Sequence, residues 1–537
     1  MQPDTWFDRL TILSNVEGSH THHPAKESPI LPAAGSRPAR VAATVFVMFL
    51  ACVLSASIQC SRPRADSEKV STPLPAGSGL DFDVVVVGAE PGGIAAAVSA
   101  ARAGARTLLI DQRNAIGGLW TLARMNTLDL VLVRNVVSGQ KSPAQRGILR
   151  EIMNKLGMNY LGWERYFDVS RMQEVLDKLV QDEPMLTVML NTRVASAVVG
   201  EGQPRPMKQI EVILADGTAK TVTGRVFVDG TDDADLVGLL GQKGEDYFIG
   251  RSDFTGKDEM MAATLMLEVK GTSGLKGTYR DATDEINSLL FANDDRVIIG
   301  AGFNIGWQRD GSVLLSSLKI CGVNGLDEKS VQEALRIGKD YAPKIVAFLN
   351  GSLTGDPVKG FEHARLVSTP DYLYIRETRH IIGLEKVTFW NIIQGVIPAD
   401  TITLGTYPID LQPWLKAENP YTYSVKVAHF PWEEIGGAGL KHRLYGIPLG
   451  ALIPKNIDNL LVVGRPISAD SIAAGSIRVM SHAVAMGEAA GAAAAFSLWD
   501  KVSIHDMAAN AGEVERVRSY LVSNRGFLLD PKGYKPE

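Results

Sequence analysis

Two parts of the sequence carry side chains that could bind an anion or move a proton. The first, "IRETRHIIG", places Arg376, Arg379 and His380 on one short segment. Two guanidinium groups and an imidazole at this spacing could hold an anionic or polyhydroxyl substrate. The same groups could instead form an ion-pair network with Glu377 and Asp371 that fixes two lobes of the protein, and the sequence leaves both roles open.

The second part lies near the C-terminus, where His482 stands in the small-residue stretch "GSIRVMSHAVAMGEAAG". A histidine there could act as a general base. A core histidine with satisfied hydrogen bonds would have the same sequence pattern. Asn126, Asp129 and Tyr445 are weaker candidates for contact with a substrate.

These side chains need a scaffold, and residues 81–111 predict its first part. The stretch "DFDVVVVGAEPGGIAAAVSAARAGARTLLID" contains a strand at Val84–Val87 that is apolar on both sides, as in a parallel sheet. An alanine-rich helix follows and ends at Gly104, and a second strand closes on Asp111. This order is a βαβ unit of the dinucleotide-binding kind.

The turn of this unit departs from the Gly-x-Gly-x-x-Gly pattern at one position. Gly88 and Gly93 stand at the first and last glycines, but Glu90 replaces the middle one. Asp111 lies 18 residues after Gly93, where a carboxylate can bind ribose hydroxyls. A charge at position 90 is unfavourable near two phosphates, so we expect its side chain to point away and Gly92 to supply some backbone freedom. In the alternative, the glycines serve only the turn of a βαβ unit that binds nothing.

A second glycine pair occurs in "RVIIGAGFNIG", at Gly300 and Gly302. The Asp310-Gly311 turn and another strand-like run follow it, so no helix N-terminus is available to bind a phosphate. We expect a sheet hairpin here, and therefore no second dinucleotide domain and no NAD(P)H site.

Composition limits the remaining possibilities. The chain has 537 residues, 45% of them hydrophobic and 21% charged, which is typical of a globular α/β protein of two or three lobes. A net charge of −5 with interspersed signs gives no reason to expect nucleic acid as a partner. The three cysteines form no C-x-x-C pair, which argues against a dithiol centre and against a metal site.

The N-terminal region predicts export or anchoring. The apolar run "VAATVFVMFLACVLSA" lies between a signal-peptide core and a short membrane span in length. We therefore expect a location at the cell envelope, with residues 41–60 cleaved, lipidated or retained in the membrane. The alternative is a cytoplasmic protein. The polar leader before the apolar run is unusually long, and a wrongly chosen start codon would explain it.

The predicted organisation is as follows: a disordered leader (1–40), a signal or anchor segment (41–60), a linker (61–80), the N-terminal part of the nucleotide domain (81–245), an inserted substrate or cap lobe (246–440), the C-terminal part of the nucleotide domain (441–500), and a C-terminal helix and tail (501–537).

Several separated blocks together resemble the FAD-dependent oxidoreductase family of glutathione-reductase-like fold, and in it the bacterial "FAD-dependent oxidoreductase" or "xanthan lyase-like" group. The blocks are the βαβ stretch, "IGGLWT", "VFVDGTDDADL", "RETRHIIG" and "YGIPLGALIPKNIDNLLVVGRPISADSIAAGSIRVMSHAVAMGEAAG". The resemblance implies an α/β fold: a Rossmann-like FAD domain with an inserted mixed α+β substrate lobe.

The resemblance also implies where FAD binds. Gly88, Gly92 and Gly93 would hold its pyrophosphate, and Asp111 would bind the adenosine ribose. Val194 matches the position whose backbone flanks the adenine.

Further FAD contacts follow along the chain. Gly117 and Gly118 match the next phosphate or ribitol contact, and Gly230 matches the crossing back toward the pyrophosphate. Gly464 and Arg465 match a second phosphate and ribitol contact.

The block "GSIRVM", with Ser476 and Arg478, would place a helix N-terminus beneath the isoalloxazine. Its dipole would stabilise the negative N1–C2=O edge of reduced flavin. Arg478 could neutralise the same charge, or it could pair with a carboxylate.

The predicted function is that of an FAD-dependent oxidoreductase. It would oxidise a small polar molecule, such as a sugar derivative, an amine or a hydroxy acid, by hydride transfer to flavin N5, and pass the electrons to an acceptor that the sequence does not identify. The alternatives are a flavin monooxygenase or halogenase-like enzyme, and an envelope-anchored flavoprotein electron carrier without its own substrate.

Overall fold

The computed structural model describes residues 79–130, 132–158, 165–275, 277–280, 282–415 and 443–536. The predicted leader (1–40), the anchor segment (41–60) and the linker up to residue 78 lie outside the described residues, as do residues 416–440 of the predicted substrate lobe. Every helix within these ranges is too short or too polar to cross a bilayer.

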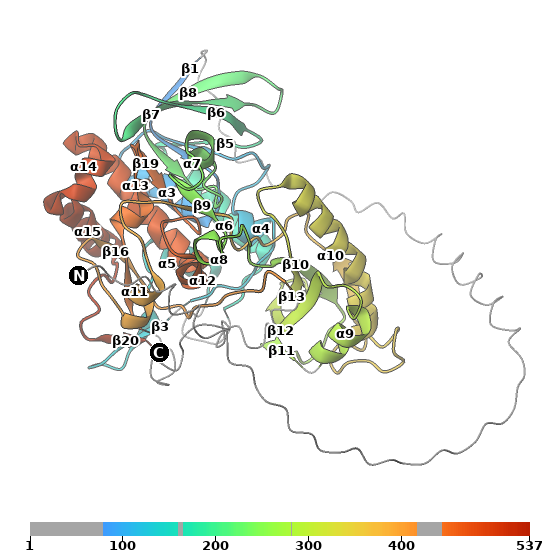
Figure 1. Ribbon diagram of the computed structural model, residues 1–537. Coiled ribbons are helices and arrows are strands. Elements are labelled where there is room, and N and C mark those ends of the chain that lie inside the picture. The colour runs from blue at the N-terminus through green and yellow to red at the C-terminus, as the bar shows by residue number, and fades with distance from the viewer. Residues whose placement is uncertain are drawn as a thin grey trace, which may run out of the picture. The chain divides into compact units, whose positions relative to one another are not determined.

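A largely parallel sheet forms the first layer (Figure 1). Strand β1 pairs in parallel with β2 and with β8, and the C-terminal strand β19 also pairs in parallel with β8. The two ends of the described chain therefore build one sheet. Its members are β1 (Gly79–Val87), β2 (Thr107–Ile110), β5 (Leu186–Met189), β6 (Arg193–Val199), β7 (Arg205–Ile213), β8 (Ala219–Asp229), β18 (Ile457–Asp458) and β19 (Leu460–Val462).

Helices α3 (Pro91–Arg102) and α13 (Met480–Asp500) pack against each other and against this sheet. Small residues allow the approach, because a Cβ on Gly487 would lie 2.0 Å from the Gly92 carbonyl oxygen. A Cβ on Gly491 would lie 2.2 Å from the Ala96 carbonyl oxygen. The contacts advance together along both helices, so the helices run parallel and their positive N-terminal ends lie at the same edge of the sheet.

A separate antiparallel sheet has the order β11-β12-β13-β10-β14, with helices α9 and α10 against it. Gly300 and Gly302 lie in β12, which pairs with β13 in the hairpin predicted from the sequence. The α/β fold class, with a Rossmann-like sheet and an additional lobe, is as predicted. The elements of this lobe are β10 (Ala263–Lys270), β11 (Thr278–Tyr279), α9 (Thr283–Leu290), β12 (Val297–Trp307), β13 (Val313–Ile320), α10 (Glu328–Leu349) and β14 (Arg365–Ser368).

Shorter elements connect the two sheets and cover the first one. They are α4 (Gly118–Thr121), β3 (Leu132–Asn135), β4 (Lys141–Pro143), α5 (Ile148–Leu156), α6 (Val169–Gln181), α7 (Asp235–Leu240), β9 (Tyr247–Ile249), α8 (Ser252–Thr255), β15 (Arg379–Ile381), α11 (Phe389–Gln394), β16 (Thr401–Gly405), β17 (Tyr445–Pro448), the 3-10 turn η2 (Leu449–Leu452), α12 (Ser471–Ile477), α14 (Ile504–Ala509), α15 (Ala511–Arg525) and β20 (Tyr534–Pro536).

Candidate functional site

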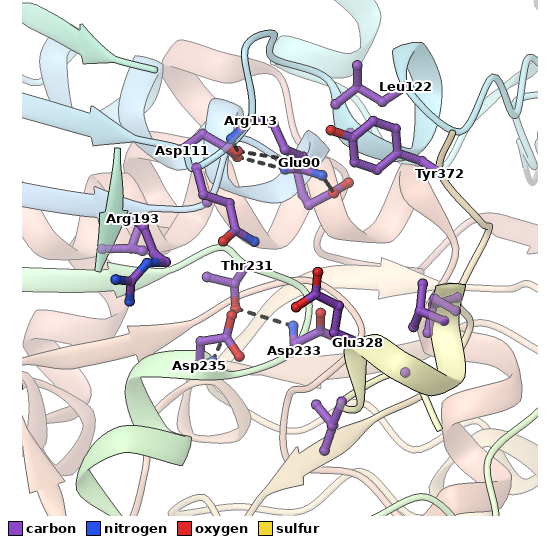
Figure 2. Close-up of a pocket in the computed structure, with 18 of the residues that line it drawn as sticks. Glu90, Asp111, Arg113, Leu122, Arg193, Thr231, Asp233, Asp235, Glu328 and Tyr372 are labelled. Carbon is purple, nitrogen blue, oxygen red and sulfur yellow. Dashed lines mark hydrogen bonds and ion pairs between the residues drawn. The ribbon is translucent and has the colours of Figure 1, made fainter. Parts of the chain in front are cut away.

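A cavity of about 770 Å³ opens at the carboxyl ends of the parallel strands (Figure 2). Gly88 and Asp111, the residues that follow β1 and β2, form part of its wall. Residues from the start of α10 and Tyr372 line it as well. The edge where parallel strands end is the usual ligand position in open α/β sheets.

Three glycines meet beneath this cavity. Gly88 has a φ of +95°, and a Cβ on it would lie 2.5 Å from the Gly230 carbonyl carbon. A Cβ on Gly93 would lie 1.9 Å from the Gly88 carbonyl oxygen. Side chains at these positions would push the turn, α3 and the end of β8 apart. The glycines of the turn are therefore required for these three elements to pack together.

Gly92 has a different environment from the one expected. A Cβ on it would lie 3.1 Å from the Ala483 carbonyl oxygen, so the position that a side chain would occupy faces α13. This glycine lets the two helices approach and does not line the cavity.

Asp111 accepts four hydrogen bonds from its own neighbourhood. Its Oδ2 accepts from the backbone N–H of Ala89 at 2.6 Å and from Arg113 Nη2 at 2.7 Å. Its Oδ1 accepts from the backbone N–H and from Nε of Arg113, both at 2.8 Å. The predicted ribose acceptor is therefore paired with an arginine that the sequence analysis did not single out, although Arg113 stands only two residues after it.

Glu90 does not point away from the phosphate region, and that prediction is wrong. Its carboxylate lines the cavity, accepts from the Leu119 backbone N–H at 2.9 Å and forms an ion pair with Arg113. The residue is 8% exposed. Arg113 supplies the counter-charge that makes this position acceptable, and Gly118 leaves room, because a Cβ on it would lie 2.0 Å from the Glu90 carboxylate oxygens.

Arg465 and Arg379 lie at the other side of the cavity and both contact the acidic run after β8. Arg465 donates to Asp233 Oδ1 at 2.6 Å, and Arg379 donates to the Asp233 carbonyl oxygen at 2.8 Å and to Asp235 Oδ1 at 3.0 Å. Asp232 has a left-handed φ of +65° and lies against Gly464, where a Cβ would be 1.9 Å from Asp232 Oδ1. Burial raises the pKa of Asp232, and the attraction of Arg465 opposes this rise.

The predicted FAD contacts thus fall into two groups. Those that line the cavity are Gly88, Asp111, Gly118, Val194 and Arg465. Those that do not are Gly92, Gly93, Gly117, Gly230, Gly464, Ser476 and Arg478.

The segment that carries Arg376, Arg379 and His380 does not bring these side chains together. Arg379 reaches the cavity, whereas His380 is buried, hydrogen-bonds Glu377 at 3.2 Å and stacks on Phe248 with ring centroids 5.0 Å apart. The alternative network with Glu377 therefore applies to His380. Asp371 is not part of it, since it pairs with Lys339.

Arg376 belongs to a second polar group, in which Arg478 also takes part. The Arg376 guanidinium lies 4.0 Å from the Tyr374 ring centroid, and it donates to the Ala262 carbonyl oxygen at 2.8 Å and to Thr264 Oγ1 at 2.9 Å. Arg478 donates to the Tyr374 hydroxyl at 2.7 Å. Both arginines are 7% exposed.

The group continues through Asp410, which accepts from Arg478 Nη2 at 3.0 Å and from Gln412 Nε2 at 2.6 Å. Gln412 in turn accepts from Lys319 Nζ. Burial and the charge of Arg376 lower the pKa of Lys319 to about 8. We call these connected residues (Lys319, Tyr374, Arg376, Asp410, Gln412 and Arg478) the arginine cluster.

Asp129 lies beside the arginine cluster. Burial raises the pKa of its carboxyl group to about 6, and the nearby Arg478 only partly offsets this. Its carbonyl oxygen accepts from Ser481 Oγ, in the first turn of α13, at 3.0 Å. Asn126 has a structural role instead, because it is buried and its amide donates to the Phe167 carbonyl oxygen at 3.1 Å.

The sequence alone did not identify most of the arginine cluster. Tyr374 lies in one loop and Asp410 and Gln412 lie in another, later one, and only the fold joins them. Lys319 gave a signal that was missed, since it is a charged residue in the otherwise apolar end of β13.

Ser476 and Tyr445 hydrogen-bond each other at 2.6 Å, and Ser476 also donates to the Tyr407 carbonyl oxygen. His482 packs edge-on against Tyr445, and both of its ring nitrogens are buried. Burial lowers the pKa of His482 to about 4. The imidazole is therefore neutral at physiological pH.

A parallel sheet, a glycine turn before a helix and a carboxylate at the end of the next strand define a dinucleotide-binding protein of the Rossmann-like class. Residues 83–521 match the FAD dependent oxidoreductase family, and the chain belongs to this family. FAD is the cofactor of the family.

Several solved structures match the chain at low sequence identity. A geranylgeranyl bacteriochlorophyll reductase-like protein from Thermoplasma acidophilum is 10% identical, with a TM-score of 0.36 over 83% of this chain and 84% of that chain. A myxobacterial chondrochloren halogenase is 10% identical, with a TM-score of 0.39 over 83% of this chain and 80% of that one. No curated protein matches the chain.

The cavity is lined by several residues that we expected to bind FAD, but its lining has more carboxylates than cations. The glycine contacts hold β1, α3 and β8 close together, and Asp111 and four arginines, among them Arg113 and Arg465, line the cavity. Glu90 adds a carboxylate where a phosphate is expected. The fit therefore depends on Arg113.

Proposed function

We propose that this FAD-dependent oxidoreductase oxidises a small anionic molecule, a hydroxy acid or a sugar acid, by hydride transfer to flavin N5. Bound FAD supplies the hydride acceptor. The hydride leaves the carbon that carries the hydroxyl group, and the hydroxyl proton passes to a base. The product is the corresponding oxo acid.

The observation that carries the proposal is the charge of the arginine cluster. Three cationic side chains lie around one carboxylate: Arg478 bonds Asp410 directly, Lys319 reaches it through Gln412, and Arg376 stacks on Tyr374, which accepts from Arg478. Among the described residues, Arg376 hydrogen-bonds neutral oxygens, those of Ala262 and Thr264, and burial lowers its pKa. A substrate carboxylate beside Arg376 would compensate this buried charge.

The position of the cluster supports a role next to the flavin. Arg478 caps the end of α12 and immediately precedes Val479, the N-cap of α13. The parallel packing of α3 and α13 brings this end of α13 to the same sheet edge as the nucleotide turn. We assign the pyrophosphate to the turn at Gly88 and the ribose to Asp111, which leaves the α13 N-terminus for the flavin ring.

Asp129 is our candidate for the base. A carboxyl group with a pKa of about 6 is mostly ionised at neutral pH and still basic enough to accept a hydroxyl proton. His482 is less suited, since its pKa of about 4 and its complete burial make it a weak base without access to a substrate.

The test is an anaerobic substrate screen with the flavin-loaded full chain, in which loss of the oxidised flavin absorbance reports reduction. The panel contains 2-hydroxy acids and sugar acids, each with a neutral alcohol or aldose of matched size, and simple amines. We expect bleaching by acids and not by their neutral partners. Bleaching by neutral sugars or amines alone would overturn the proposal.

A variant pair connects the result to the cluster. Arg376→Met should raise KM for the acid about 100-fold, the usual effect of losing a charge-assisted hydrogen bond to a substrate, and leave the flavin content unchanged. Arg443→Met is the control, because Arg443 is exposed and donates to the Gln394 carbonyl oxygen, outside the arginine cluster. An unchanged KM in Arg376→Met would remove Arg376 from the substrate site.

A further inference from the structure

The nucleotide cavity carries more negative than positive charge. Of the described residues that line it, six are acidic and four are arginines. The acidic ones are Glu90, Asp111, Asp233, Asp235, Glu328 and Asp371, and the arginines are Arg113, Arg193, Arg379 and Arg465. FAD brings two further negative charges on its phosphates, so its binding depends on which arginines can turn toward them.

Two of the arginines that line the cavity already pair with other carboxylates. Arg465 and Arg379 are held by the acidic run after β8, each with at least one hydrogen bond of 2.8 Å or less. Arg113 lies nearest the glycine turn, and its guanidinium spans from Asp111 to Glu90 (Figure 2). Its contact with Glu90, a residue of the turn, makes it our candidate for the cation that binds a phosphate there.

Glu90 is well suited to hold Arg113. Its carboxylate stands at the middle position of the Gly-x-Gly-x-x-Gly turn, where the backbone otherwise comes closest to a pyrophosphate. One oxygen pairs with Arg113 Nη1, and the other accepts from the Leu119 N–H at 2.9 Å. The Glu90 carboxylate, which accepts hydrogen bonds from two donors at this place, therefore offers Arg113 the same kind of anionic acceptor as a phosphate oxygen does.

We propose that Glu90 is an internal competitor of the FAD pyrophosphate for the Arg113 guanidinium. Arg113 exchanges one anion for another when the cofactor binds, and Glu90 lowers the affinity of the site for phosphate-bearing ligands. This proposal rests on the family's use of FAD and is independent of the substrate proposed above.

The competition makes a prediction that distinguishes phosphate from adenosine. Glu90→Gln keeps the shape of the side chain and removes its charge, so Arg113 becomes available to the ligand. The affinity for ADP should rise about tenfold, and the affinity for adenosine, which has no phosphate, should change less than twofold. Arg113→Met should weaken ADP binding by a similar factor, and in the double variant the gain from Glu90→Gln should disappear.

Calorimetric titration of the flavin-free full chain with ADP and with adenosine measures these affinities. Glu328→Gln is the matched control, because Glu328 lines the opposite wall of the cavity and its loss changes the net charge by the same amount. We expect a much smaller gain from it. In the flavin-loaded protein, the rate of FAD release after dilution should fall about tenfold in Glu90→Gln, which tests the proposal without removing the cofactor.

Three results would overturn the proposal. One is an ADP affinity in Glu90→Gln that is unchanged or weaker. Another is an equal gain for adenosine and ADP, which would make Glu90 a structural residue. The third is an equal gain in Glu328→Gln, which would reduce the effect to net charge. Circular dichroism of each folded variant separates these outcomes from loss of the fold.

Discussion

Gly93→Ala should remove FAD from the protein, and the structure gives the size of the effect. The added Cβ would lie 1.9 Å from the Gly88 carbonyl oxygen, whereas ordinary van der Waals contacts of a Cβ begin at 3.4 Å. Helix α3 or the end of β1 must therefore move by about 1.5 Å, the difference between these distances. Both partners are backbone, so no side chain can relieve the contact by changing its rotamer.

The cost of such overpacking is at the upper end of the usual range, about 3 kcal/mol. If the turn moves and α3 stays packed on α13, the free energy of FAD binding becomes less favourable by this amount. This corresponds to about a 100-fold loss of FAD affinity. The assay is the flavin-to-protein absorbance ratio of the purified full chain, followed by FAD titration.

Gly217→Ala serves as the control for general destabilisation. Gly217 lies in the β7–β8 hairpin turn with a φ of +84° and nothing within 4 Å of an added Cβ. Its substitution costs about 1 kcal/mol of backbone strain and should leave the flavin content unchanged. Normal flavin content in Gly93→Ala would show that the turn does not form the cofactor site.

Two further predictions concern buried charges. Arg525→Met should lower the free energy of unfolding by about 3 kcal/mol, because it leaves Glu488, whose side chain is 0% exposed, without its ion-pair partner; denaturant titration measures this, and a double variant with Glu488→Gln should recover part of the loss. His482 has a folded-state pKa of about 4 against 6.5 when unfolded, so the unfolded chain takes up the proton first and stability is lost as the pH falls from 6.5 toward 4. The loss amounts to about 3 kcal/mol, and His482→Gln should flatten this part of the pH profile; an unchanged slope would mean that the imidazole is not desolvated.

Local pattern was sufficient for the nucleotide half of the fold. The residue types of the valine strand, the glycine turn and the alanine-rich helix each favour the backbone conformation that they adopt. The pairing of β1 with β2 follows from the βαβ order. The hairpin at Gly300 was also predictable, because no helix follows it.

Side-chain partners were not predictable in the same way. Glu90 was expected to avoid the phosphate region because the charge of Arg113 was not considered, and that charge acts only once Asp111 fixes the guanidinium. Arg376 and His380 are close in sequence, and the sequence left open whether they hold a substrate together or form an ion-pair network. Their side chains point in different directions. Arg376 and Arg478 instead both contact Tyr374, which lies between them in space.

The parallel contact of α3 and α13 explains how the two sites are joined. Both helices carry small residues on the shared face, so their axes approach and their N-terminal ends stay level. One end faces the glycine turn, and the other follows Arg478 of the arginine cluster. A molecule that spans both ends, with phosphates at one and a redox ring at the other, would meet a positive dipole at each. This arrangement gives a physical reason why an extended dinucleotide suits the protein. It also explains why the cluster that we assign to the substrate lies at the N-terminus of α13 rather than beside Glu90.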